Sequence, residues 1–281
     1  MRRSRTIWLA KISFIDRGAA QLSMVHRRFP ESLRHALDPE RRVRYYGRAW
    51  RLSQPRWDDD AGTVAAQLGF RRRTKQEEVD YDEERHEWVS SEAAARQGNF
   101  ANFVIDVPNQ LLGFEDRGDD LKRESFLNAF RRFLQPAGLE VSLISDTREF
   151  DAWLETVDTV TRFRVTLRRP NPGYSKRAAQ VRDLARETEA DRLTVEAESK
   201  DGLNVRDTLL DGAADTAAMG NGSYKATGLT ADGRRRFFDS AKRYLSTAID
   251  VTTSDSAATI AAKIDDAMRE IAPDPPERVD G

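Results

Sequence analysis

Residues 191–236 read DRLTVEAESKDGL, then NVRDTLLDGAADTAAM, then GNGSYKATGLTADGRRR, and they carry the clearest structural signals in the chain. In the first part, apolar residues from Leu193 to Ala197 alternate with polar ones, which predicts an amphipathic β-strand. Residues 204–219 are typical of a helix, and the glycines after them predict a helix C-cap and a tight turn that leads into a hairpin. A strand, a helix and a hairpin in succession favour an α+β fold.

Similar patterns extend on both sides of this stretch. As far as residue 117, short alternating runs separated by turn residues predict a twisted antiparallel β assembly with one face in water. From residue 118 onward, helical and strand patterns alternate. We therefore expect an α+β fold in which an antiparallel β-rich region (1–117) precedes a mixed sheet with alternating helices (118–272), followed by a Pro-rich, acidic and disordered tail (273–281).

The composition limits the class of protein. Of the 281 residues, 39% are hydrophobic and 33% are charged, so the chain can build a core although its net charge is only −1. The charges are uneven, because residues 1–56 hold 14 Arg or Lys against four acids. The chain has no cysteine, which excludes disulfides and thiolate sites. No run approaches the ~20 apolar residues of a membrane span, and the N-terminus is no signal peptide, so we expect a cytoplasmic protein without membrane insertion.

An acidic strand offers one candidate for catalysis. Glu198, Ser199 and Lys200 have the spacing of the (D/E)xK element of metal-dependent nucleases, with Glu196 two residues earlier. No upstream carboxylate lies at the tip of a Pro-preceded strand, and the same alternation is typical of an ordinary solvated sheet face. The three histidines have no metal-ligand spacing. We expect no catalytic residue, metal or cofactor, and keep a Mg²⁺-dependent nuclease as the alternative.

Basic clusters offer a candidate for binding, because they occur where strands meet turns. Residues 162–177 hold six basic residues and no acid, and three consecutive arginines end the hairpin. Such clusters neutralise phosphates and give affinity that depends on salt and not on sequence. The competing interpretation is a set of solvated surface arginines. The predicted DNA-binding residues are Arg71, Arg72, Arg73, Arg168, Arg169, Lys176, Arg177, Arg234, Arg235 and Arg236.

The layout of residues 139–239 resembles that of the RexA-like phage exclusion proteins. The similar parts are the basic strand RFRVTLRRPN, the strand LTVEAESKDG and the hairpin GSYKATGLTADG, each separated by a helix. The resemblance covers a third to a half of the chain. It implies an RdgC-like fold, a homodimer, and sequence-non-specific binding of double-stranded DNA in antiviral defence by temperate phages.

These observations favour a DNA-binding protein that acts in phage exclusion or prophage control. A nuclease at the acidic strand, and a non-catalytic interaction module of a phage-defence system, remain as alternatives. The physiological trigger, the dimer surface, the path of the DNA and a companion membrane protein are left open by the sequence.

Overall fold

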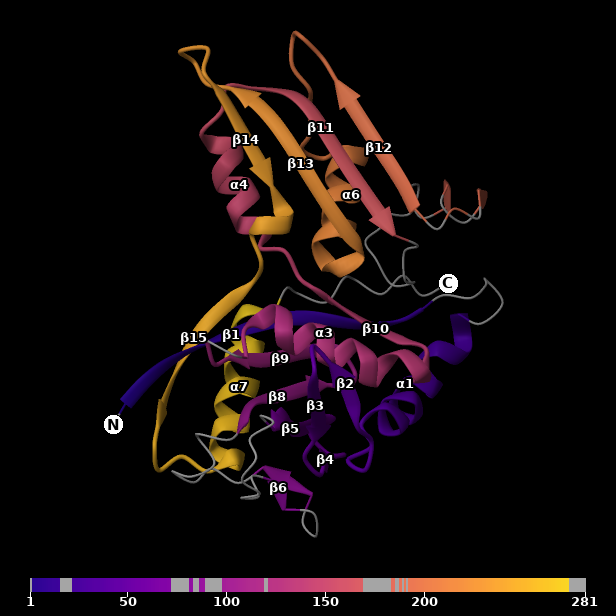
Figure 1. Ribbon diagram of the computed structural model, residues 1–281. Coiled ribbons are helices and arrows are strands. Elements are labelled where there is room, and N and C mark those ends of the chain that lie inside the picture. The colour runs from indigo at the N-terminus through magenta and orange to yellow at the C-terminus, as the bar shows by residue number, and fades with distance from the viewer. Residues whose placement is uncertain are drawn as a thin grey trace. The chain divides into compact units, whose positions relative to one another are not determined.

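The computed structural model describes residues 2–15, 22–71, 81–82, 86–88, 98–118, 121–168, 183–184, 187–188, 190 and 192–272 (Figure 1). The chain forms two compact units. The first comprises Met1–Ile15, Ser23–Val141 and Ser246–Ala272, and the second is built on Ser142–Leu245. The α+β fold is confirmed, since each unit combines an antiparallel sheet with helices.

The first unit contains a large sheet in the order β10-β1-β9-β8-β5-β3-β2, to which β15 adds beside β1 and β4 beside β5. A separate two-stranded ribbon is formed by β6 and β7. The elements of this unit are β1 (Arg2–Phe14), α1 (Leu22–Ala36), β2 (Val43–Tyr45), β3 (Arg48–Leu52), β4 (Arg56–Asp58), β5 (Thr63–Arg71), β6 (Tyr81–Asp82), β7 (Glu87–Trp88), β8 (Gly98–Asp106), β9 (Leu111–Asp116), α3 (Arg123–Leu134), β10 (Leu139–Leu143), β15 (Ser246–Thr252) and α7 (Ala257–Ile271).

Both faces of this sheet are covered, whereas the sequence predicted one face in water. Phe114 of β9 stacks on Phe126 of α3, with ring centroids 4.3 Å apart. Its neighbour Gly113 points to the opposite face, where a Cβ would lie 2.3 Å from Met268 Sδ of α7. Successive residues of a strand face opposite sides, so α3 and α7 cover different faces of the sheet. Helices on both faces account for the nearly continuous burial of β9.

The division of the chain differs from the expected boundary between residues 117 and 118. Helix α3 follows that boundary, yet it packs on β8 and β9 through Phe126. Strand β15 pairs with β1 over seven residues, from Arg2↔Thr252 to Trp8↔Ser246, and so returns the C-terminal part of the chain to the first unit. These contacts join segments distant in sequence, which a change of local pattern cannot reveal. The expected tail, 273–281, lies outside the described residues.

A buried polar network crosses the middle of the first sheet. Glu115 of β9 is 0% exposed and accepts hydrogen bonds from the backbone N (2.9 Å) and Nδ2 (2.7 Å) of Asn102. Arg5 Nη1 donates to the other carboxylate oxygen, Oε2, at 2.5 Å, and Arg117 Nη1 lies 3.6 Å from Oε1. Gln67 Nε2 extends the network by donating to Asn102 Oδ1 at 2.9 Å. The carboxylate is thus fully satisfied in a place where an unpaired charge would be costly.

The second unit has a four-stranded sheet in the order β12-β11-β13-β14, and every pairing within it is antiparallel. The sequence predicted a mixed sheet because strands and helices alternate. That alternation connects β12 through α6 to β13, and β11 lies between these two strands, so no neighbours are parallel. The elements of this unit are α4 (Thr147–Glu155), β11 (Thr159–Arg168), β12 (Arg192–Glu198), α6 (Leu209–Thr216), β13 (Gly222–Leu229) and β14 (Arg235–Asp239).

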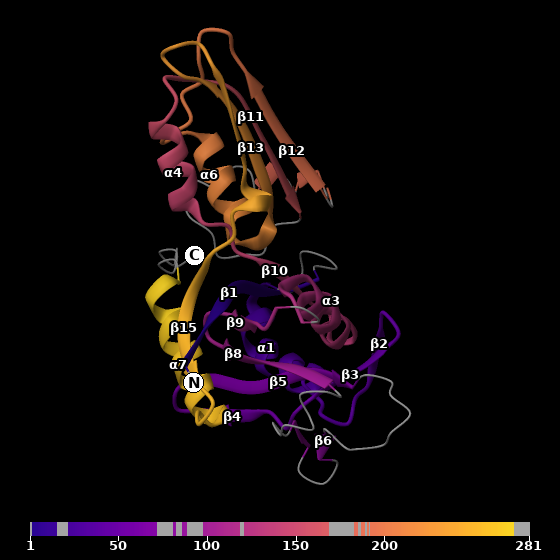
Figure 2. The same ribbon diagram turned by 60° about the vertical axis from the view of Figure 1, so that its left-hand side comes forward.

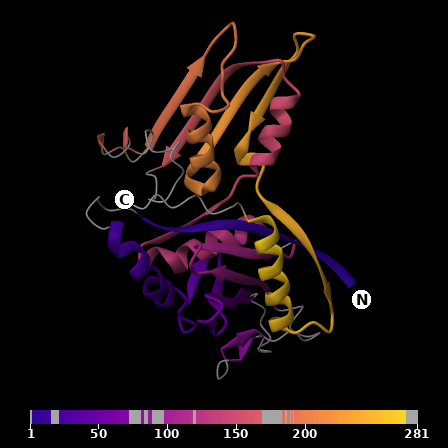
Figure 3. The same ribbon diagram turned by 180° about the vertical axis from the view of Figure 1, so that it is seen from behind.

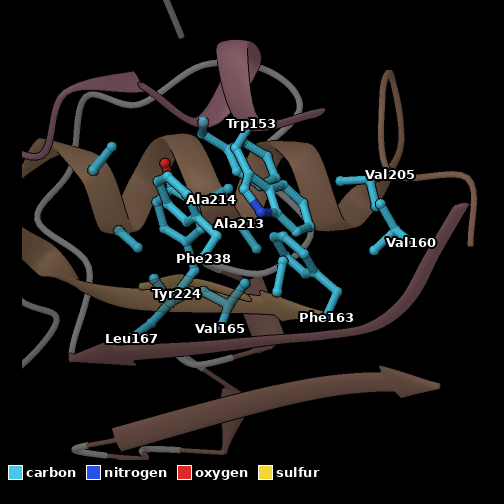
Figure 4. Packing of buried hydrophobic residues seen from close by; sticks show 14 residues of the cluster. Trp153, Val160, Phe163, Val165, Leu167, Val205, Ala213, Ala214, Tyr224 and Phe238 are labelled. Carbon is cyan, nitrogen blue, oxygen red and sulfur yellow. The ribbon is translucent and has the colours of Figure 1, made fainter. Parts of the chain in front are cut away.

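Helices α4 and α6 lie on the same side of these four strands (Figures 2 and 3). Asp146 caps α4 by accepting a hydrogen bond from the backbone N of Arg148. Between the helices and the sheet lies an aromatic core built around Phe150, Phe163, Tyr224 and Phe238 (Figure 4). Aromatic rings that pack edge-to-face or offset-stacked stabilise a core by more than the burial of their apolar surface alone.

The hydroxyl group of Tyr224 supports a stability prediction. Tyr224 is 1% exposed, and within the part of the chain that the structure describes its hydroxyl has no hydrogen-bond partner. Burial raises the pKa of Tyr224 above its usual range. Tyr224→Phe removes a polar group that folding takes out of water, so it should stabilise the protein by about 1 kcal/mol in urea unfolding.

The advantage of Tyr224→Phe should also grow above pH 10. The unfolded tyrosine ionises near 10.0 while the folded one stays protonated, so the wild type loses stability as the pH rises. A phenylalanine variant that is less stable than the wild type at pH 7 would show that the hydroxyl is satisfied.

Candidate nucleic-acid interface

The sheet of the second unit has one face covered by helices and one face in water. On β11, Phe163, Val165 and Leu167 are fully buried against α4 and α6, while the residues between them point away from the helices. The same alternation holds on β13, where Tyr224 and Ala226 are buried and Lys225 is exposed. We call the outward side the open face of the second sheet.

The open face is lined mainly by basic residues. The register places Arg164 of β11 between Glu196 of β12 and Lys225 of β13, and Lys225 lies opposite Asp239 of β14. Directly opposed residues share a face, so the register identifies the charged groups that the described strands place there. The six basic residues are Arg162, Arg164, Arg168, Arg192, Lys225 and Arg235, and the three acids are Glu196, Glu198 and Asp239.

Several of these charges are already paired on the open face. Arg162 Nε donates to Glu196 Oε1 at 2.6 Å, and this hydrogen bond raises the pKa of Arg162. Lys225 Nζ lies 3.0 Å from Asp239 Oδ2, and Arg164 Nε lies 3.9 Å from Glu196 Oε2. The basic side chains of these pairs are more than half exposed, so such pairs contribute little to stability. The face keeps a surplus of three positive charges that phosphates can neutralise.

An aromatic ring stands on the same face. Phe237 of β14 is 72% exposed and lies opposite Thr227, which in turn lies opposite Arg162. Large apolar side chains are mostly buried, and a single exposed one is common on protein surfaces, so this ring by itself only offers an apolar surface to a ligand. Nucleobases stack on such rings whatever their identity.

The three arginines predicted at the end of the hairpin, Arg234–Arg236, are all exposed. They follow the turn between β13 and β14, in which Gly233 has a φ of 77° and its N donates to Thr230 O at 2.8 Å. Arg235 points to the open face, whereas Arg236 lies opposite the inward-facing Gly228. Arg234 Nε lies 3.1 Å from Asp232 Oδ2. The hairpin therefore supplies one of its three arginines to the open face.

Of the remaining predicted residues, the structure describes Arg71 and Arg168. Arg168 is on the open face, but β11 reaches the hairpin at Thr159, nine residues or about 30 Å away along the strand. Arg71, at the end of β5, belongs to the first unit. Arg72, Arg73, Arg169, Lys176 and Arg177 lie outside the described residues.

The acidic strand of the nuclease alternative is β12. Glu196 and Glu198 project from it onto the open face, and Lys200 is exposed beyond its end. Glu196 accepts its hydrogen bond from an arginine, which is the arrangement of a surface ion pair. In the described parts of the chain, no three Asp, Glu or His side chains are grouped so that they could hold a metal ion. The geometry thus gives the nuclease alternative no support.

The predicted DNA-binding residues leave out several residues of this face, because most of that set consists of adjacent basic residues. Arg162, Arg164 and Lys225 are single cations separated by inward-facing residues. Their signal is the period of two, which assigns each of them to the polar side of a strand. A basic residue at every second position of a strand is therefore the sequence signal of this face.

Comparison with known proteins supplies a family and no function. No curated protein matches the chain. None of the helices in the described segments is long and apolar enough to cross a membrane. A family model matches residues 67–272, which include all the strands of the open face. The chain therefore belongs to the DUF4747 family, which is described as a domain of unknown function.

Proposed function

We propose that the protein binds double-stranded DNA without sequence preference, through the open face of the second sheet. The observation that carries this proposal is the set of six basic residues against three acids on one exposed surface. Phosphates of a nucleic-acid backbone would compete with Glu196 and Asp239 for the cations already present. The gain comes from counterions that the DNA releases on binding.

The geometry favours binding without sequence preference. A flat sheet face presents no projecting helix or ribbon that could enter the major groove and read base edges. Phosphate contacts fix the position of a protein on DNA and carry no sequence information. Stacking of an unpaired base on Phe237 would add affinity that is likewise independent of sequence. A single strand is therefore the second ligand to test.

Salt dependence is the decisive measurement. Fluorescence anisotropy with two duplexes of unrelated sequence should give similar affinities at low salt, and both should fall as salt rises. The logarithm of the affinity should decrease by about 0.9 per phosphate neutralised for each tenfold rise in salt. A single strand of the same length, measured beside the duplexes, shows which form the face prefers. If the protein does not bind DNA at low salt, or if its affinity does not change with the salt concentration, the proposal is wrong.

We propose that this binding acts in the cytoplasm, in phage exclusion or prophage control. The support is the layout resemblance of residues 139–239 to the RexA-like proteins. In this role the protein would coat or bridge DNA, and the lack of sequence preference would let it act on any invading genome.

A further inference from the structure

Strand β12 is an open edge of the second sheet. Among the strands that the structure describes, it pairs only with β11, in an uninterrupted register from Arg162↔Glu198 to Arg168↔Arg192. Proteins usually protect an edge with a proline, a bulge, an inward-pointing charge or a very short strand. β12 has seven residues, no proline and no bulge, and its charged residues, Arg192, Glu196 and Glu198, point to the open face and not inward. The opposite edge, β14, is shorter and begins with two arginines.

The inward-facing row of β12 is incompletely covered. Leu193, Val195 and Ala197 are half-buried, although their partners on β11 are at most 1% exposed. Among the residues that the structure describes, the core under α4 and α6 takes in Leu193 from this row and neither Val195 nor Ala197. Apolar side chains along an unpaired edge are typical of a strand that receives another strand.

The outward-facing row of β12 is complementary to itself in an antiparallel register. When Val195 pairs with its own counterpart in a second copy, Arg192 lies opposite the partner's Glu198, and Glu198 lies opposite the partner's Arg192. Opposite charges in directly facing positions stabilise an antiparallel pair. The same register places Leu193 against the partner's Ala197, so the apolar row continues as well.

We propose that β12 pairs with β12 of a second copy of this chain, in the antiparallel register centred on Val195. The two four-stranded sheets then form one sheet of eight strands around a two-fold axis. The axis is perpendicular to the sheet, so both open faces lie on the same side. This inference does not depend on the proposed DNA binding.

Charge reversal tests the register in sedimentation-velocity experiments without nucleic acid. The wild type should dimerise, and Glu198→Arg and Arg192→Glu should each weaken the dimer at least about tenfold, because both contacts become repulsive. An equimolar mixture of the two variants should recover a dimer, since each reversed charge then faces its complement. Circular dichroism of each variant confirms that the exposed substitution leaves the fold intact.

Glu155→Arg is the matched control, because it makes the same change at an exposed position of α4 in the same unit. It should leave dimerisation unchanged. A wild type that stays monomeric up to high concentration would overturn the proposal. So would a dimer that Glu198→Arg leaves unaffected, or two variants that do not associate when they are mixed. DNA binding by a monomer would leave the proposed function in place.

Discussion

Glu115→Ala should destabilise the first unit by about 3–5 kcal/mol, the largest effect that we expect from one substitution. The change removes the carboxylate that Arg5 and Arg117 share and leaves the backbone N and Nδ2 of Asn102 buried without their acceptor. The side chains of the two arginines are 18% and 23% exposed, so water replaces the lost contacts only in part. Urea unfolding followed by tryptophan fluorescence measures the loss, because four of the five tryptophans belong to this unit.

Two further variants give this result its meaning. Glu115→Gln keeps an acceptor for Asn102 and loses the charge, so it should be less destabilising than the alanine variant. Glu40→Ala removes a carboxylate that is exposed in the same unit, and it should change the stability by less than about 0.5 kcal/mol. If Glu115→Ala lowers the free energy of unfolding by less than about 1 kcal/mol, the network does not contribute the stability that we assign to it.

Reversing two charges in the middle of the open face, Arg164→Glu with Lys225→Glu, should reduce DNA affinity about 100-fold at low salt. The two residues lie opposite each other on β11 and β13, so the change turns the centre of the face acidic. The slope of log affinity against log salt should become shallower by about 2, since two phosphate contacts disappear. The anisotropy titration described above measures both quantities.

The control carries the same change in net charge elsewhere. Arg28→Glu with Lys122→Glu alters two exposed residues of the first unit and should leave the affinity within about twofold. Plaque counts on cells that express each variant extend the test to the proposed role, because only the open-face variant should lose phage exclusion. If the two double variants bind DNA with equal affinity, the DNA interface does not lie on the open face.

Most secondary structure followed from local signals in the sequence. The turn between β8 and β9 contains Pro108 and Asn109, and α4 begins after its cap, Asp146. Gly220, with a φ of 91°, ends the helical segment in the left-handed region, as expected of a helix C-cap. Such signals depend on a few neighbouring residues, and the sequence contains them completely.

The division into units and the candidate interface required the tertiary structure. Arg2 pairs with Thr252, and α7 packs against β9 at Gly113. Both contacts join residues that are distant in the chain. The period of two assigns Arg164 and Lys225 to the polar faces of their strands, and the sequence alone establishes that much. Arg164 and Lys225 lie side by side because β11 and β13 are neighbours in the sheet. The backbone hydrogen bonds that join two strands are the same whatever side chains the strands carry, so the local sequence does not determine which strands pair.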